Sequence, residues 1–455
     1  MNKITARFLE LFYKISGIPR ESGREEKFAD FLESFAKEHN LYCFRDKNNN
    51  VLIKKQGNKQ NNETVIFQAH MDMVCVKCEN SKHNFETDPI EIVRNGDIIS
   101  AKDTSLGADQ GIGLAIMLLL LESDEIVHPN LECMFTTEEE TTFNGAVNFD
   151  YSKLSGKKLI NLDHYKDNTI VIGCSAEICN KYTFEGTLES NDLSTYEIYL
   201  TDIKGGNSRV EIERCEKNAI TQIAKIIQML QTQDEVYICS IDGGKSEGDI
   251  ATSCRCIIKT KIDDIENRIN CLNIDGKVQI CKAENRLSFS LQDSKKIILE
   301  IISLNQGIIM KENNNILVSG NIGIIKTVGN KVYITGIMQS LDKEKLENYN
   351  KENIRISNNN NYISEEVYQD SAWIPNEKSK LLEDYRRAYY RINGSFPTTE
   401  VAYGGLECCT IAKRIKDMDM ISIGSNIEGF HSVNEKMYIS SCEKTIKTLL
   451  DYLKN

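Results

Sequence analysis

Four short apolar runs in this chain are each followed by acidic or imidazole side chains. Val65–Ala69 is followed by His70 and Asp72, Leu131–Phe135 by Glu138–Glu140, Lys158–Leu162 by Asp163, and Met420–Gly424, after a short loop, by His431. Apolar runs of this length are typical of buried strands, and helical patterns separate them, so the chain is predicted to be α/β with a mostly parallel sheet flanked by helices. Ligands of such sheets bind beyond the carboxyl ends of the strands, which is where these ionisable residues stand.

A glycine-rich segment, Gly107–Gly113, lies between the first two runs and carries Asp109. It leads into Leu114–Leu121, an apolar stretch that is predicted to be a buried helix. The segment has neither the G-x-G-x-x-G pattern nor the Gly-Lys-Ser/Thr ending of a phosphate-binding loop. Nucleotide binding is therefore disfavoured, and Asp109 joins the other ionisable residues as a candidate for the site.

The stretch from 176 to 374 has a different pattern. Short alternating segments such as Tyr196–Leu200 and Lys331–Thr335 are mixed with helical ones such as Ala219–Leu230, which predicts an α+β unit. The helix predicted at Leu381–Arg391 and the run before His431 return to the α/β pattern. We therefore expect a discontinuous catalytic domain, residues 1–175 and 375–455, with an α+β domain inserted at 176–374.

Charge and composition argue against several classes of protein. Acidic residues outnumber basic ones, 67 to 55, and the net charge of −12 argues against sequence-independent binding of nucleic acid. No stretch has the ~20 apolar residues that a membrane-spanning helix requires, and the first residues lack the apolar core of a signal peptide. The 15 cysteines are irregularly spaced, which indicates reduced thiols rather than a disulfide framework. We expect a cytoplasmic protein that binds neither membrane nor nucleic acid.

The ionisable residues at the strand ends match the needs of a two-metal site. Such a site requires about three protein ligands for each ion and a carboxylate shared between ions ~3.5–4 Å apart. Five candidates are available, so that one shared ligand leaves three for each ion: His70, Asp109, Glu140, Asp163 and His431. Imidazole with carboxylate suits zinc, cobalt or manganese better than magnesium. Asp72 is a candidate to orient the His70 ring, and Glu139 is a candidate general base.

Each candidate also has a plain structural explanation when it is taken alone. His70 would then be an interior histidine, Asp109 a helix N-cap and Glu138–Glu140 a solvated face. The joint pattern favours the metal site, because the chain has only six histidines and two of them follow strand-end runs. The other four histidines are expected to be structural.

Six segments, taken together and in order, resemble the aminoacyl-histidine dipeptidases, which belong to a wider clan of binuclear zinc aminopeptidases, carboxypeptidases and aminoacylases. The segments are His70–Cys75, Thr104–Gly113, Glu139–Ala146, Asn161–Asp163, Gly404–Cys408 and His431–Glu435. The resemblance implies that Asp109 bridges two ions, that His70 and Asp163 hold one of them, and that Glu140 and His431 hold the other. It also implies that Glu139 is the general base and that Asp72 is the partner of His70.

The same resemblance implies that the inserted domain is a lid that contacts the substrate and forms a homodimer. In the lid this chain departs from the family pattern. Asn207 replaces a histidine that polarises the scissile carbonyl, and Gln339 replaces an arginine that holds the substrate carboxylate. Asp249 lies in a further altered stretch, and Tyr403 replaces another histidine.

Two functions follow from the sequence. The first is a dipeptidase acting on dipeptides, among them those with a C-terminal histidine, in which Glu139 takes a proton from the attacking water and passes it to the leaving amine. The substrate's amino group would then lie near a metal ion or near Glu407. The second is a metal-retaining binding or regulatory protein with lost or redirected hydrolysis, because Asn207 and Gln339 weaken the grip on the substrate. The intact Glu139 favours the first.

Overall fold

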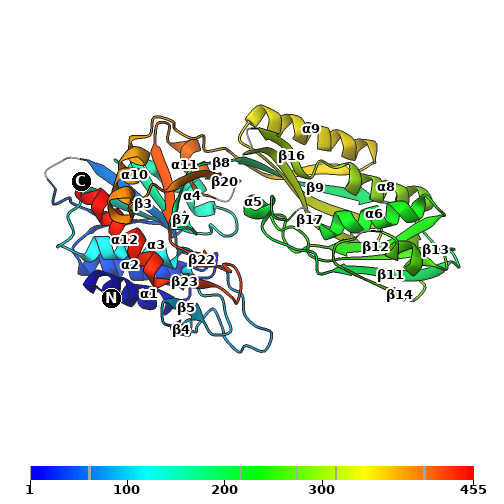
Figure 1. Cartoon of the computed structure of the whole chain (residues 1–455), viewed down its shortest axis with the longest axis horizontal. Coiled ribbons are helices and arrows are strands. Elements are labelled where there is room, and N and C mark those ends of the chain that lie inside the picture. The colour runs from blue at the N-terminus through cyan, green and yellow to red at the C-terminus, as the bar shows by residue number, and fades with distance from the viewer. Residues whose placement is uncertain (1, 60–62, 216, 273, 313–314, 403–405) are drawn as a thin grey trace. The chain divides into compact units, whose positions relative to one another are not determined.

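A computed structural model of the chain describes residues 2–455 apart from 60–62, 216, 273, 313–314 and 403–405. The chain divides into two compact units (Figure 1). The first comprises Met1–Cys174, Trp373–Val401 and Leu406–Asn455, and the second is built mainly from Ser175–Ala372. The first unit therefore takes its strands and helices from both ends of the chain.

The first unit is built around a sheet whose described strands follow the order β1-β2-β6-β3-β7-β21-β8-β20. These strands span Tyr42–Arg45 (β1), Val51–Lys55 (β2), Thr64–His70 (β3), Asn130–Thr136 (β6), Lys158–His164 (β7), Thr169–Cys174 (β8), Thr398–Ala402 (β20) and Asp419–Gly424 (β21). The central strands β6, β3, β7 and β21 are parallel, whereas β1, β2 and β8 pair antiparallel. The predicted fold class is confirmed, and the carboxyl ends of the parallel strands meet at one edge.

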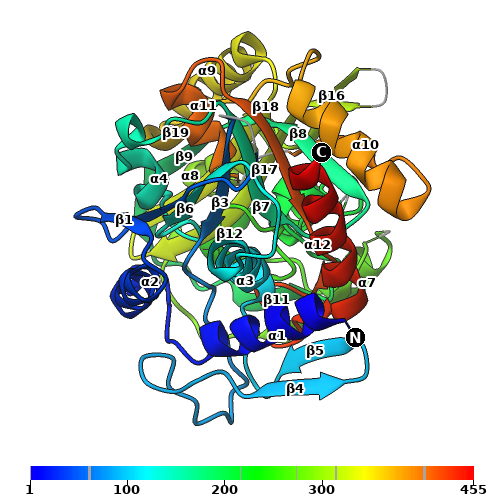
Figure 2. The ribbon, with the colours of Figure 1, turned by 90° about the vertical axis from the view of Figure 1, so that its left-hand side faces the viewer.

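Helices cover this sheet because their apolar faces need a partner. They span Lys3–Ser16 (α1), Glu26–Glu38 (α2), Ala108–Glu122 (α3), Asn144–Asn148 (α4), Lys380–Asn393 (α10), Cys408–Arg414 (α11) and Ile439–Lys454 (α12), with a 3-10 turn at Tyr151–Lys153. The predicted buried helix is confirmed as α3, which packs against α1 and against strands β3 and β7 (Figure 2). No helix in the described ranges is long and apolar enough to cross a membrane.

A smaller antiparallel sheet in the first unit has the order β22-β23-β5-β4. Its strands span Ile92–Asn95 (β4), Ile98–Ala101 (β5), Ile427–Glu428 (β22) and Lys436–Tyr438 (β23). Because β23 pairs with β5, the loop between β22 and β23 lies beside the segment that follows β5. This pairing brings His431 close to Asp109, although the two residues are far apart in the sequence.

The second unit contains a larger antiparallel sheet with the order β14-β11-β13-β12-β17-β18-β9-β19, and β16 also pairs with β17. The strands of this unit span Ala176–Glu185 (β9), Leu188–Glu189 (β10), Ser194–Thr201 (β11), Val236–Gly243 (β12), Cys254–Thr260 (β13), Lys277–Lys282 (β14), Ser288–Phe289 (β15), Gly307–Glu312 (β16), Asn315–Val328 (β17), Lys331–Ser340 (β18) and Ile363–Asp370 (β19). Its helices span Ser208–Glu211 (α5), Ala219–Gln231 (α6), Ile265–Asn270 (α7), Leu291–Ser303 (α8) and Lys343–Asn359 (α9). Helices α6 and α8 pack together on β12, and α9 packs on β9 and β18. The predicted α+β character of this part of the chain is confirmed.

Candidate metal centre

Five side chains of the first unit meet beyond the carboxyl ends of its parallel strands. His70 is the last residue of β3, Asp163 lies near the end of β7, and Glu140 lies in the loop after β6. Asp109 lies in the first turn of α3, and His431 lies between β22 and β23. The structure thus brings together residues from five separate segments, all of which the sequence pattern had singled out.

The carboxylate of Asp109 lies between the two imidazoles. Its Oδ1 is 3.3 Å from His70 Nε2, and its Oδ2 is 3.4 Å from His431 Nε2. Asp163 Oδ1 lies 3.8 Å from His70 Nε2, and Glu140 Oε1 lies 2.9 Å from His431 Nε2. The donors therefore form two groups that share Asp109, which is the division that a bridging carboxylate requires.

Glu139 faces the same space from the loop after β6. Its Oε2 lies 3.9 Å from His70 Nε2, and it is 8% exposed. The ligand atoms of His70, Glu139 and Asp163 lie within 4.8 Å of one another, as do those of His70, Asp109 and Glu140. Glu139 therefore stands as close to the His70 group as a ligand would, and its role as a base rather than a ligand stays a prediction.

Burial and crowding shift the pKa values of these groups. Burial, together with the carboxylates of Asp163 and Glu140, raises the pKa of Glu139 well above its ordinary value despite the opposing effect of His70. Burial and the nearby carboxylates also raise the pKa of Asp163. For His431, burial opposes protonation, but the carboxylates of Glu140 and Asp109 outweigh it and raise the pKa to about 11. These shifts favour the protonated forms, because carboxylates clustered in a buried place repel one another.

The donor set fits two divalent cations. Asp109, Glu139, Glu140 and Asp163 concentrate four carboxylates in a largely buried place, where uncompensated negative charge is costly. Two imidazoles balance at most half of that charge even when both are protonated. Divalent cations would supply the missing positive charge, and imidazole with carboxylate is the ligand set that zinc, cobalt and manganese accept.

Asp72 is buried beneath the site and contacts two of its segments. His70 Nδ1 lies 3.1 Å from the backbone carbonyl oxygen of Asp72 and 3.4 Å from its Oδ1. The Asp72 carboxylate also accepts hydrogen bonds from the backbone N–H groups of Glu139 and Glu140, each at 3.1 Å, and from the Ser22 hydroxyl at 2.8 Å. Asp72 therefore holds both the His70 ring and the loop that carries the two glutamates.

Glu407 is fully buried at the start of α11. Its Oε2 accepts hydrogen bonds from Gln68 Nε2 at 2.5 Å and from the Thr136 hydroxyl at 2.6 Å. Its Oε1 has no hydrogen-bond partner among the described groups. Burial is the main cause that raises the pKa of Glu407 to about 7. Contact between Glu407 and a substrate amino group stays a prediction, and in this structure its partners belong to strands β3 and β6.

The residues predicted to contact substrate from the inserted domain lie within the second unit. Asn207 caps the start of α5 and forms an isolated bridge with Asp249. Gln339 is buried in β18 and donates its amide to Glu177 Oε2 at 2.6 Å. The fourth altered position, Tyr403, lies outside the described residues. The roles of Asn207 and Gln339 in binding substrate stay predictions.

Sequence reasoning missed two buried charged residues beside the centre. Arg20 is 2% exposed and donates to the backbone carbonyl oxygens of Met71, Asp72 and Gly107 at 2.9, 2.8 and 2.5 Å. Glu435 is also 2% exposed and accepts hydrogen bonds from backbone N–H groups at the start of α3. Both bind to backbone groups, so no complementary side chain reveals their roles, although Glu435 ends one of the six motif segments, His431–Glu435.

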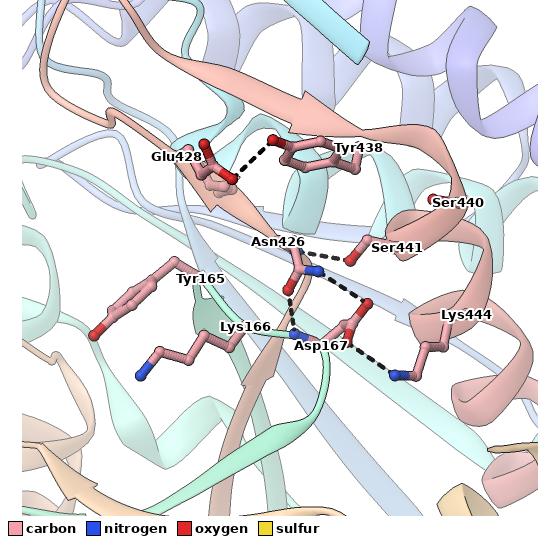
Figure 3. A pocket seen from close by; sticks show the side chains of 10 residues that line it. Tyr165, Lys166, Asp167, Asn426, Glu428, Tyr438, Ser440, Ser441 and Lys444 are labelled. Atoms are coloured by element: carbon pink, nitrogen blue, oxygen red, sulfur yellow. Dashed lines mark hydrogen bonds and ion pairs between the residues drawn. The ribbon is translucent and has the colours of Figure 1, made fainter. Parts of the chain in front are cut away.

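A surface cavity of about 670 Å³ opens elsewhere on the first unit (Figure 3). It is lined by Tyr165, Lys166, Asp167, Asn426, Ile427, Glu428, Tyr438, Ser440, Ser441 and Lys444. Asp167 accepts hydrogen bonds from Lys444 Nζ at 2.9 Å and from Asn426 Nδ2 at 3.3 Å, and the Tyr438 hydroxyl donates to Glu428 at 2.8 Å. Because these polar groups are paired with one another, we assign no ligand to this cavity.

Comparisons with known proteins agree with this geometry. The chain matches the family model for Peptidase family M20/M25/M40 over residues 66–455. It is similar to the cytosol non-specific dipeptidase of Escherichia coli (strain K12), with 26% identity over 98% of this chain and 96% of the relative. Its structure is similar to that of an aminoacylhistidine dipeptidase from Vibrio alginolyticus, with a TM-score of 0.80, 27% identity and coverage of 100% and 98% of the two chains.

A more distant likeness concerns the fold alone. The aminopeptidase PepT from Bacillus cereus ATCC 10987 has a TM-score of 0.60 and 16% identity over 99% of this chain and 98% of its own. The likenesses extend across both units rather than being confined to the metal centre. The resemblance inferred from the sequence motifs is confirmed, and the chain belongs to Peptidase family M20/M25/M40.

Proposed function

We propose that this protein is a cytoplasmic dipeptidase that hydrolyses dipeptides at a centre of two divalent ions, with zinc as the expected metal. Family membership implies a dinuclear metal site, and two relatives that match over nearly their full length are dipeptidases by name. The observation that carries the proposal is the position of Asp109, whose two oxygens face His70 and His431 separately. The cytoplasmic location rests on the name of the Escherichia coli relative.

The ligand roles follow from the two groups of donors. His70 and Asp163 would hold one ion, Glu140 and His431 would hold the other, and Asp109 would be shared. Divalent ions in such a centre act as Lewis acids toward a carbonyl oxygen and lower the pKa of water.

Three contacts of Glu139 support its role as the general base. It is buried, it faces the space shared with His70, and Asp72 fixes its loop by accepting its backbone N–H. In the proposed reaction the Glu139 carboxylate takes a proton from the attacking water. It then delivers that proton to the nitrogen of the scissile bond, so that the C–N bond breaks and the amine leaves neutral rather than as an anion.

One feature of the second unit favours the alternative of lost or redirected hydrolysis. Gln339, which stands where an arginine is expected to hold the substrate carboxylate, is 2% exposed and donates its amide to Glu177. A neutral amide that already serves a buried carboxylate is a weaker partner for a substrate carboxylate than a guanidinium. On this basis we expect slower turnover or an altered substrate range rather than the loss of metal binding.

We also infer a homodimer formed through the second unit. Strand β19 lies at the edge of its sheet, and its side chains Ile363 and Val367 are 74% and 53% exposed. Apolar residues on an edge strand favour pairing with another chain. Light scattering should therefore give a dimer for the wild type and a monomer for Ile363→Lys with Val367→Lys, whereas a monomeric wild type would contradict the inference.

The proposed function is tested by loading the purified protein with zinc, manganese or cobalt in separate samples. Each sample is assayed against a dipeptide panel that includes Xaa-His substrates, and its bound metal is counted. Turnover by protein carrying about two ions per chain supports the dipeptidase. Two bound ions without turnover of any dipeptide would favour the binding or regulatory alternative, for which Asn207→His is the next variant. Protein that binds no metal would contradict both.

A further inference from the structure

The side chain of Glu435 closes the start of helix α3 from a distant part of the chain. Its Oε2 accepts hydrogen bonds from the backbone N–H groups of Leu106 and Gly107 at 2.8 and 2.9 Å. Its Oε1 accepts from those of Ala108 and Asp109 at 2.8 and 3.2 Å. Four consecutive backbone N–H groups, from Leu106 to Asp109, are thus bound by one buried carboxylate.

The sequence around α3 supplies no local cap that could do this. The N-cap residue is Gly107, which has a φ of 69° and no side chain to accept a hydrogen bond. Several backbone N–H donors stabilise a buried carboxylate. Glu435 accepts from four of them, and the last belongs to Asp109, whose side chain lies between two imidazoles.

Glu435 also links the two segments that carry Asp109 and His431. It follows His431 by four residues, and its backbone N–H donates to the carbonyl oxygen of Ser432 at 3.2 Å, which closes the turn between them. The same segment is also bound by Arg20, which donates to the Gly107 carbonyl oxygen and to the carbonyl oxygens of Met71 and Asp72, just after β3. The Asp109 segment is therefore held by two buried side chains, Glu435 through its N–H groups and Arg20 through a carbonyl oxygen.

We propose that Glu435 is a positioning residue of the metal centre: its carboxylate fixes Asp109 relative to His431 and so sets the affinity of the protein for its ions. The proposal rests on the proposed function, because it takes Asp109 and His431 as ligands. If Glu435 only stabilised the fold, loss of its carboxylate would mainly lower the free energy of unfolding. As a positioning residue, its loss should lower the affinity for metal ions more than it lowers stability. Partners that orient metal ligands typically contribute about 10–100-fold in metal affinity.

The test compares wild type, Glu435→Ala, Glu435→Gln and the control Glu428→Gln. Glu428 is the last residue of β22, just before the loop that holds Glu435, but its side chain is 58% exposed and pairs with Lys436 at the surface. Zinc affinity is measured by competition with a chromophoric chelator, and the absorption spectrum of the cobalt-loaded protein reports the geometry of the site. Glu435→Ala should bind zinc about 10–100-fold more weakly with an altered cobalt spectrum, and Glu428→Gln should match the wild type.

Chemical rescue separates the carboxylate from the packing of the side chain. Glu435→Ala leaves a space lined by four N–H donors, so formate should restore part of its zinc affinity, whereas chloride at equal ionic strength should not. Zinc affinity within twofold of the wild type, or a loss that formate and chloride change equally, would overturn the proposal.

If Glu435→Ala does not fold, Glu435→Gln decides the matter. Its oxygen keeps one pair of N–H donors while its amide group opposes the other pair, so weaker zinc binding supports the proposal and wild-type affinity overturns it. A wild-type protein that binds fewer than two ions would instead contradict the proposed metal centre itself.

Discussion

The ion pair between Arg209 and Glu177 in the second unit should be costly to break. Arg209 Nε and Nη2 donate to the Glu177 carboxylate at 2.9 and 2.6 Å. The Glu177 side chain is 3% exposed and that of Arg209 is 20% exposed. Glu177 also accepts hydrogen bonds from the Tyr368 hydroxyl at 2.5 Å and from Gln339 at 2.6 Å. Arg209→Met would keep much of the apolar stem but leave a buried carboxylate with neutral donors alone.

The expected loss follows from these contacts. Removing one partner of a buried ion pair costs ~3–5 kcal/mol. The donors from Tyr368 and Gln339 remain, and Arg209 is partly exposed, so we expect ~3 kcal/mol, the lower end of that range. In the double variant with Glu177→Gln no charge is left buried, and the loss should fall to ~1–2 kcal/mol, the value of the missing hydrogen bonds.

The assay must report on the second unit by itself. The single tryptophan, Trp373, belongs to the first unit, so its fluorescence does not report on the second unit by itself. Hydrogen–deuterium exchange in peptides from β9 and β18 reports the opening free energy of the second unit. A matched control is Arg255→Met, because Arg255 is 50% exposed and lies 3.5 Å from Glu197, and such surface pairs contribute less than ~1 kcal/mol.

Two results would refute this reasoning. The first is an Arg209→Met variant whose opening free energy in β9 and β18 lies within ~1 kcal/mol of the wild type, which would show that the pair is effectively solvated. The second is a double variant as unstable as Arg209→Met, which would show that lost packing rather than a buried charge causes the effect.

Three further substitutions probe the supports of the metal centre and the core of the second unit. Asp72→Asn should weaken zinc affinity by about 10–100-fold in a chelator competition, because its amide group would oppose a backbone N–H of the Glu139 loop. Gly145→Ala should lower the free energy of unfolding by ~1–3 kcal/mol in urea titrations followed by tryptophan fluorescence, since the added carbon would lie 2.4 Å from the backbone of Thr137. Burial raises the pKa of Glu300, so wild-type stability relative to Glu300→Gln should fall as the pH rises above the ordinary glutamate pKa of about 4.3. The fall ends once the pH passes the raised pKa, and thermal unfolding of both proteins across this range measures it.

Each of these three predictions can be contradicted by a specific result. Asp88→Asn changes a half-buried aspartate of the first unit, whose carboxylate is bonded to Asn84 and Thr87, and should leave zinc affinity unchanged. If Asp72→Asn bound zinc as tightly as the control Asp88→Asn, the Glu139 loop would keep its position without the Asp72 carboxylate. A Gly145→Ala variant as stable as the wild type would show that the Thr137 segment yields to the added methyl group. A constant stability difference between wild type and Glu300→Gln at every pH would contradict the shifted pKa.

The sequence allowed the parallel core to be predicted because buried strands and the helix at α3 carry strong apolar patterns. It also allowed the candidate ligands to be placed together. His70 and Asp163 end neighbouring parallel strands, and the carboxyl ends of parallel strands must share an edge. Glu140 follows from the same rule, since it lies in the segment that joins β6 to α4. Asp109 does not, because its helix follows β5 of the smaller antiparallel sheet, and only its glycine-rich segment singled it out.

Other features depend on pairings that leave no pattern in the sequence. His431 reaches the centre through β22 and β23, which are too short to show a strand period. Arg20 and Glu435 bind backbone groups, which every residue carries. The engagement of Gln339 with Glu177 follows from the register of β18 on β9, where the two residues stand opposite each other. A register of this kind is set by the folded sheet rather than by either strand alone.

The most direct test of the central claim compares wild type with Glu139→Gln, each loaded with zinc and assayed in the same preparation for bound metal and for dipeptide hydrolysis. If the five ligands hold the ions and Glu139 moves the proton, both proteins should carry about two ions per chain, and turnover should fall by about 10²–10⁴-fold in the variant. Turnover within tenfold of the wild type, or a loss of bound zinc in step with the loss of turnover, would contradict the account, because Glu139 would then be dispensable or would itself be a ligand.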